Sequence, residues 1–148
     1  MEGLVSDEIA KKVASHIAKY DKLIGLFDME IEEASAGYAR VSMEVGPNHL
    51  NAAGLCHGAA LFALADVAFA LAVNCYGKMA LAIEASMNYF RPVKLGARVE
   101  ASCEELFQGR RTGTYICHLR DSDQKKIAVF KATAFRIDEG AVTLRNRG

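Results

Sequence analysis

A single carboxylate inside a long apolar segment is the residue of this chain best placed to do chemistry. Residues 59–73 are alanine, leucine, phenylalanine and valine, and Asp66 is their only charged member. A helix that is apolar on every face is buried, and a carboxylate inside it is costly unless it is hydrogen-bonded, paired or neutralised. Asp66 therefore either has a structural partner, such as the backbone or Asn51, or acts as a general base or nucleophile.

The residues directly before this segment are asparagine, glycine and histidine in a run typical of a turn. The turn over 51–58 leads into the predicted helix, and the first N–H groups of a helix have no helical partner. Asn51 and Gly54 are ordinary turn formers. His57 can hydrogen-bond the backbone at the helix entry, so a structural role for it is as consistent with the sequence as a chemical one.

The overall charge excludes some classes of function. The 148 residues include 18 basic and 18 acidic ones, so the net charge is zero, which predicts no binding to nucleic acid or to an anionic membrane surface. The N-terminus lacks the basic and apolar regions of a signal peptide. As a helix, residues 59–73 would extend about 22 Å, less than the ~30 Å core of a bilayer. We therefore expect a cytoplasmic protein with no membrane segment.

The cysteines predict neither a metal centre nor a cysteine nucleophile. No C-x-x-C pair occurs, and without an export signal the thiols are expected to be reduced and buried. Two of the cysteines precede a histidine, but no second ligand pair follows at the spacing of a zinc site. The four residues are Cys56, Cys75, Cys103 and Cys117.

Hydrophobic periodicity predicts the elements that position the central helix. Apolar residues recur at helical spacing from Ile9 to Tyr20, which predicts an amphipathic helix ending near Lys22 or Gly25. Alternation of apolar and polar residues predicts six strands, over 27–32, 40–45, 79–90, 98–104, 112–119 and 127–137. In the strand over 79–90 the alternation places five residues on one face: Leu81, Ile83, Ala85, Met87 and Tyr89.

The predicted order is one helix, two strands, the buried helix and four strands. Short turns between successive strands indicate an antiparallel meander. We expect one α+β domain, with an N-terminal helix over 1–24, a core over 25–137 and a polar tail over 138–148. Because one sheet covers only one side of a helix, the sheet must curl around it, or a second subunit must cover the far side, or both.

This order and these residues resemble the hotdog fold and, more narrowly, the acyl-CoA thioesterases of the phenylacetic-acid-degradation type. The resemblance covers about residues 25–137 and rests on Asn51-x-x-Gly54-x-x-His57-Gly58, followed by Leu64-Ala65-Asp66. Weaker support comes from Tyr89-Phe90-Arg91-Pro92 and from Gln108-Gly109-Arg110-Arg111-Thr112-Gly113. Many relatives have two glycines after the histidine, where this chain has Gly58-Ala59, a departure that bears on specificity more than on activity.

The resemblance implies a sheet wrapped around the central helix and a homodimer with its two helices back to back, often paired into a homotetramer. It implies hydrolysis of an aryl- or medium-chain acyl-CoA thioester to the free acid and CoA, without a metal or organic cofactor. Asp66 matches the catalytic carboxylate, Gly58 matches the residue whose N–H polarises the carbonyl, and Asn51 and His57 match positions near the reacting centre. Candidates for contact with CoA, which could equally be solvated, are Arg91, Arg110, Arg111 and Thr112.

The chemistry of thioester hydrolysis suits these implied roles. Negative charge develops on the carbonyl oxygen, and an unpaired N–H at a helix start stabilises it; Gly58 lets a ligand approach that amide closely. Gly58 and Asp66 are eight residues apart, about 12 Å along a helix, so one chain cannot bring both to the same carbonyl. If both act, two antiparallel helices must share the site across a two-fold dimer.

Two other functions remain compatible with the sequence. One is a non-catalytic protein of the same fold that binds or senses acyl-CoA. The other is an enoyl-CoA hydratase, which would need His57 to act with an acid near the helix start. The acyl group is open: aromatic acetyl, hydroxybenzoyl and medium-chain aliphatic groups all suit an apolar pocket.

Overall fold

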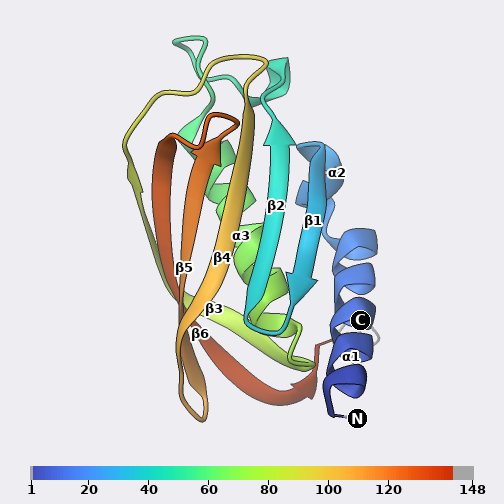
Figure 1. Ribbon diagram of the computed structural model, residues 1–148. Helices are drawn as coiled ribbons and strands as arrows, with labels where there is room; N and C mark the ends of the chain where they lie inside the picture. The colour runs from blue at the N-terminus through green and yellow to red at the C-terminus, as the bar shows by residue number, and fades with distance from the viewer. Residues whose placement is uncertain (1, 142–148) are drawn as a thin grey trace.

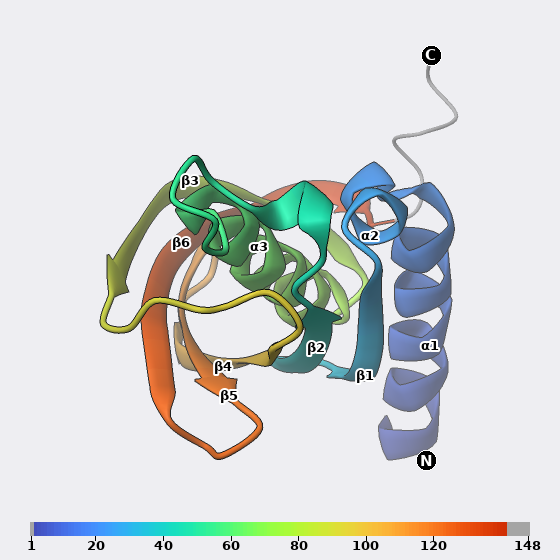
Figure 2. The ribbon, with the colours of Figure 1, turned by 90° about the horizontal axis from the view of Figure 1, so that it is seen from above.

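A six-stranded antiparallel sheet wraps around a central helix in the computed structural model, which describes residues 2–141 (Figure 1). Two helices come first, α1 (Glu2–Tyr20) and α2 (Lys22–Leu26), and the central helix is α3 (Gly58–Asn74). From above, α3 lies inside the curved sheet and α1 lies along its outer edge beside β1 (Figure 2). The other elements are β1 (Met29–Ser35), β2 (Tyr38–Glu44), the short helix η1 (Pro47–His49), β3 (Lys78–Tyr89), β4 (Arg98–Gln108), β5 (Thr112–Asp121) and β6 (Lys126–Gly140).

The order of strands in the sheet is β1-β2-β4-β5-β6-β3. Three predicted hairpins, β1–β2, β4–β5 and β5–β6, are antiparallel neighbours. The prediction of a simple meander is wrong for β3, which pairs with β6 at the far edge of the sheet and not with β4. The reason is that α3 lies between β2 and β3 in the chain and fills the inside of the curved sheet, so that β3 runs with β6 along the side of α3 away from β2 and β4 (Figure 2).

The inner face of the sheet is apolar, because alternate residues of each strand point toward α3. Val41 of β2, Ala101 of β4, Cys117 of β5 and Phe130 of β6 are fully buried, and they form one core with Leu64 of α3. Removal of this apolar surface from water is the main force that holds α3 inside the sheet. All four cysteines are buried free thiols, as predicted.

One side of α3 is left partly uncovered by the described part of the chain. Ala59 is exposed and Phe62, Asp66 and Ala70 are half-buried, whereas most of the other α3 residues are buried. The spacing of these four residues places them in one line along the helix, and we call this line the open stripe. No helix within residues 2–141 is long and apolar enough to cross a membrane.

The edge strand β3 departs from its predicted pattern. A β-bulge between Ala82 and Glu84 shifts its register against β6, and a bulge inserts one residue and so breaks the alternation. Leu81 and Ile83 are therefore 55% and 61% exposed, while Ala85 and Met87 pack against the core. The prediction of one apolar face running from Leu81 to Tyr89 is wrong for this reason.

The elements near the two ends of the chain have other bounds than the sequence predicts. The expected N-terminal helix over 1–24 is two helices, because Asp21 has extended backbone and caps α2 by accepting a hydrogen bond from the Leu23 N–H at 3.0 Å. The strand predicted to end at Ile137 continues to Gly140. The predicted tail over 138–148 therefore starts later, and its residues 142–148 lie outside the described part of the chain.

Candidate active site

The first turn of α3 has one free N–H group. His57 is the N-cap: its Nδ1 accepts from the Ala59 N–H at 3.1 Å, and its carbonyl oxygen accepts from Ala60 and Leu61. Within residues 2–141 no acceptor is found for the Gly58 N–H, which is thus the unpaired donor of this helix start. An unpaired N–H at this helix start was predicted from the sequence. His57 has the structural role that the sequence allowed for it, a hydrogen bond to the backbone at the helix entry.

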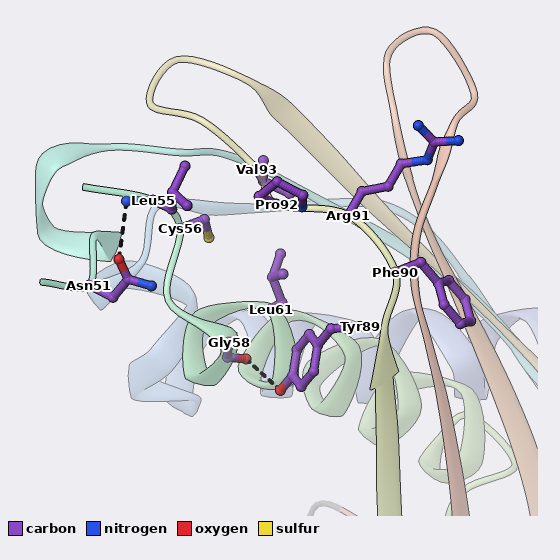
Figure 3. Close-up of a pocket in the computed structure, with 10 residues that line it drawn as sticks. All are labelled: Asn51, Leu55, Cys56, Gly58, Leu61, Tyr89, Phe90, Arg91, Pro92 and Val93. Carbon is purple, nitrogen blue, oxygen red and sulfur yellow. Dashed lines mark hydrogen bonds between the residues drawn. The ribbon is translucent and has the colours of Figure 1, made fainter. Parts of the chain in front are cut away.

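Gly58 is in contact with a tyrosine from the end of β3. The Tyr89 hydroxyl donates to the Gly58 carbonyl oxygen at 3.0 Å (Figure 3). A Cβ atom on Gly58 would lie 3.1 Å from Cζ of Tyr89, so a larger residue would push the ring away. Burial raises the pKa of Tyr89, which keeps its hydroxyl protonated as a donor. Sequence reasoning missed Tyr89 as a site residue, since 31 positions separate it from Gly58.

A cavity of about 310 Å³ opens beside this helix start. Asn51, Gly58 and Arg91 all line it, so three of the predicted site residues come together, and the Arg91 side chain extends away from Gly58 (Figure 3). The remaining lining residues are mostly apolar: Leu55, Cys56, Leu61, Tyr89, Phe90, Pro92 and Val93. We call this space the α3 entrance cavity.

Asn51 shapes the turn that leads into the cavity. Its Oδ1 accepts from the Ala53 N–H at 3.0 Å and from the Leu55 N–H at 3.1 Å. Gly54 adopts a φ of 76°, which only glycine reaches without strain. These two residues are turn formers, as their types indicate, and the amide nitrogen of Asn51 is the part of that side chain left for a ligand.

Asp66 lies two turns beyond Gly58 on the open stripe and does not line the entrance cavity. No hydrogen bond to its carboxylate is found within the described residues, so neither Asn51 nor the backbone of its own chain is the structural partner considered above. Burial raises the pKa of the Asp66 carboxyl, and the negative charge of Asp21 raises it further. A half-buried, unpartnered carboxyl with a raised pKa is suited to accept a proton or attack a carbonyl carbon.

The other predicted CoA contacts lie at the opposite end of the molecule. Arg110 and Arg111 line a second cavity of about 240 Å³ with Lys78, Arg136, Ile137 and Asp138, and we call it the basic cavity because four of these six residues are cationic. Lys78 begins β3 and Tyr89 ends it, so this basic cavity lies about 36 Å from the entrance cavity along the strand. Thr112 is exposed at the start of β5 and does not line it.

Arg136 makes the basic cavity chemically distinctive. Its Nε and Nη2 atoms are buried and have no hydrogen-bond partner among residues 2–141, and its guanidinium lies 4.7 Å from the centre of the Tyr76 ring. The Tyr76 hydroxyl is hydrogen-bonded to Glu105. Unpartnered guanidinium donors beside three further cations and one carboxylate, Asp138, favour an anion such as a phosphate. Within residues 2–141 no group of three or more His, Cys, Asp or Glu side chains is arranged to hold a metal ion.

Comparisons with known proteins identify the family of this chain. The family model described as "Thioesterase superfamily" matches residues 53–128. A protein of Archaeoglobus fulgidus is 43% identical over 89% of this chain and 86% of its own. The acyl-coenzyme A thioesterase PaaI of Escherichia coli is 35% identical over 82% of this chain and 84% of its own.

Solved structures of thioesterases have the same fold as this chain. The E. coli PaaI protein from the phenylacetic acid degradation operon superposes with a TM-score of 0.87 and 32% identity, over 90% of this chain and 96% of that one. A hypothetical thioesterase from Streptococcus pneumoniae, solved with coenzyme A, superposes with a TM-score of 0.72 and 27% identity, over 75% and 90% of the two chains. The resemblance to hotdog proteins is thus confirmed, and the chain is a thioester hydrolase that belongs to the thioesterase superfamily.

Proposed function

We propose that this protein hydrolyses acyl-CoA thioesters at a site shared by two copies of the chain. The observation that carries the proposal is that one helix holds two groups without a partner among residues 2–141, the Gly58 N–H donor and the Asp66 carboxyl. Gly58 and Asp66 are eight positions apart in the sequence, which corresponds to about 12 Å of helix. A second α3 that packs antiparallel on the first would bring the Asp66 of one copy to the Gly58 of the other.

Two uncovered surfaces support a dimer. The open stripe of α3 is the only side of that helix which the sheet of residues 2–141 leaves bare, and a second α3 would cover it. The edge strand β3 presents Leu81 and Ile83 to solvent, and an exposed apolar edge strand favours pairing with another strand. The further step to a dimer of dimers rests on the family resemblance alone.

The proposed reaction begins with the thioester carbonyl oxygen bound by the Gly58 N–H of one copy. As a general base, Asp66 of the other copy removes a proton from water while the water oxygen attacks the carbonyl carbon. As a nucleophile, its carboxylate attacks directly and forms a mixed anhydride, which water then hydrolyses. In both routes the carbon–sulfur bond breaks, the CoA thiolate leaves and takes up a proton, and the free acid is the second product. Neither route uses a metal or organic cofactor.

The basic cavity is the candidate site for the phosphates of CoA. The S. pneumoniae relative was solved with coenzyme A, and CoA carries several phosphate groups. If two β3 strands pair antiparallel, the Lys78 end of one copy lies near the Tyr89 end of the other. Arg110 and Arg111 of one copy would then serve the entrance cavity of its partner, whereas Arg91 would serve its own.

Free-thiol release from a panel of acyl-CoA substrates tests the proposal. We expect Asp66→Asn to lose about 100-fold or more of the wild-type kcat. Asp28→Asn is the matched control, because Asp28 is exposed and its φ of 53° also suits asparagine. Full activity of Asp66→Asn on every substrate would refute the mechanism. Tight binding of acyl-CoA by the wild type without turnover would instead favour the non-catalytic binding protein.

A further inference from the structure

A third cavity, of about 230 Å³, lies between the C-terminal half of α1 and the open stripe of α3. We call it the α1–α3 cavity. It is separate from the entrance cavity and the basic cavity, with which it shares no lining residue. Among the residues that line it are His16, Tyr20, Asp21, Ala70, Asn74 and Met79.

The polar residues of this cavity have structural roles in its wall. The rings of His16 and Tyr20 contact each other with centroids 4.7 Å apart, and Asp21 caps α2. The Asn74 amide nitrogen donates to the carbonyl oxygens of Ala70 and Ala80, at 2.9 Å and 3.3 Å. The surface left facing the cavity is predominantly apolar, so its natural occupant is a hydrocarbon group.

The cavity begins one helical turn beyond Asp66. Ala70 follows Asp66 on the open stripe, about 6 Å along the helix axis, and Asn74 follows another turn later. The charge of Asp21 acts on the Asp66 carboxyl, so the wall formed by the N-terminal helices is close to that group. The entrance cavity lies in the other direction, toward Gly58.

We propose that the α1–α3 cavity receives the acyl group of the thioester, so that Ala70, Met79 and the end of α1 select acyl length. This inference rests on the proposed function, in which the reacting carbonyl lies at Asp66. A carbon–carbon bond extends a chain by at most about 1.5 Å, so at least about four bonds are needed to reach Ala70. About eight bonds are needed to reach Asn74. Acetyl and propionyl groups stop short of the cavity.

The test is a kcat/KM series on acyl-CoA substrates from acetyl to dodecanoyl. For the wild type we expect little change up to butanoyl, then a rise of about fourfold for each methylene that enters the cavity, and a plateau beyond about ten carbons. Ala70→Leu fills the cavity, and we expect it to abolish the rise of kcat/KM relative to its own value for acetyl-CoA. Ala18→Leu is the matched control, because Ala18 is exposed on α1 and does not line the cavity.

A second variant has the opposite expected effect. Met79→Ala enlarges the cavity, and we expect the plateau to move by about two carbons toward longer acyl groups. It also keeps the test decisive if Ala70→Leu fails to fold or to dimerise, which thermal unfolding and sedimentation velocity would reveal. Unchanged acyl profiles in Met79→Ala and in folded Ala70→Leu would overturn the inference. The proposed function would survive that result, and it fails separately if Asp66→Asn remains active.

Discussion

Replacement of Gly58 by proline removes one N–H group and adds side-chain atoms beside Tyr89. Gly58 is the first residue of α3, a position where proline is favoured because its N–H would be unpaired in any case. The residue before a proline must be extended, and His57 already is, with φ −62° and ψ 136°. We therefore expect α3 to form normally in Gly58→Pro.

The new side-chain atoms touch Tyr89, and a control is needed for that contact. A Cβ on Gly58 lies 3.1 Å from the Tyr89 Cζ, so the ring must move by a few tenths of an ångström. Gly58→Ala makes the same contact and retains the N–H. The difference between the two variants therefore isolates the hydrogen-bond donor.

Loss of one oxyanion-hole donor costs about 10²–10³ in kcat, equivalent to about 2.7–4 kcal/mol. We expect Gly58→Pro to be slower than Gly58→Ala by that factor in free-thiol release at saturating acyl-CoA. Thermal unfolding of the two variants should coincide within a few degrees. Equal kcat values in two equally stable variants would show that the Gly58 N–H does not polarise the carbonyl.

Asp66→Asn should stabilise the fold at neutral pH, because burial raises the pKa of Asp66 above its ordinary 3.8. Protonated Asp66 stabilises the folded state fully below about pH 3.8, and this stability is lost as pH rises through the raised pKa of the folded protein. The increase in Tm that calorimetry measures for Asp66→Asn over the wild type should therefore vanish in acid. Asn74→Ala leaves the Ala80 N–H and carbonyl unpaired, and a urea titration should show about 2–4 kcal/mol less stability; an unchanged midpoint contradicts this. Leu81→Lys with Ile83→Lys should give a folded, inactive monomer in sedimentation velocity, and an active dimer would exclude pairing through β3.

The central helix could be predicted from the sequence because a segment of its composition is stable only when it is buried. An apolar segment too short for a bilayer must be buried by protein, and its lone carboxylate at Asp66 is conspicuous for that reason. The strands of the inner core were predictable in the same way, since Val99, Ala101 and Cys103 alternate with polar residues and are buried. Such features depend on neighbours in the sequence.

Features that depend on distant pairing could not be predicted. The place of β3 beside β6, and its bulge at Ala82, follow from how α3 crosses the sheet, which periodicity does not encode. Tyr89 reaches Gly58 only because β3 ends beside the start of α3. Arg91 and Arg110 were grouped by residue type as contacts for CoA, yet the fold separates them by the length of β3.

Subunit complementation tests the shared site most directly. Asp66→Asn retains an intact Gly58 N–H, and Gly58→Pro retains an intact Asp66 carboxylate, so each homodimer lacks one component at both sites. A mixed dimer of the two variants has one complete site if the site is shared across the two-fold axis. Random exchange of equal amounts makes half of the dimers mixed, so we expect activity to return to about a quarter of the wild-type value. Exchanged dimers that stay as inactive as the two parents would contradict a site built from Gly58 of one copy and Asp66 of the other.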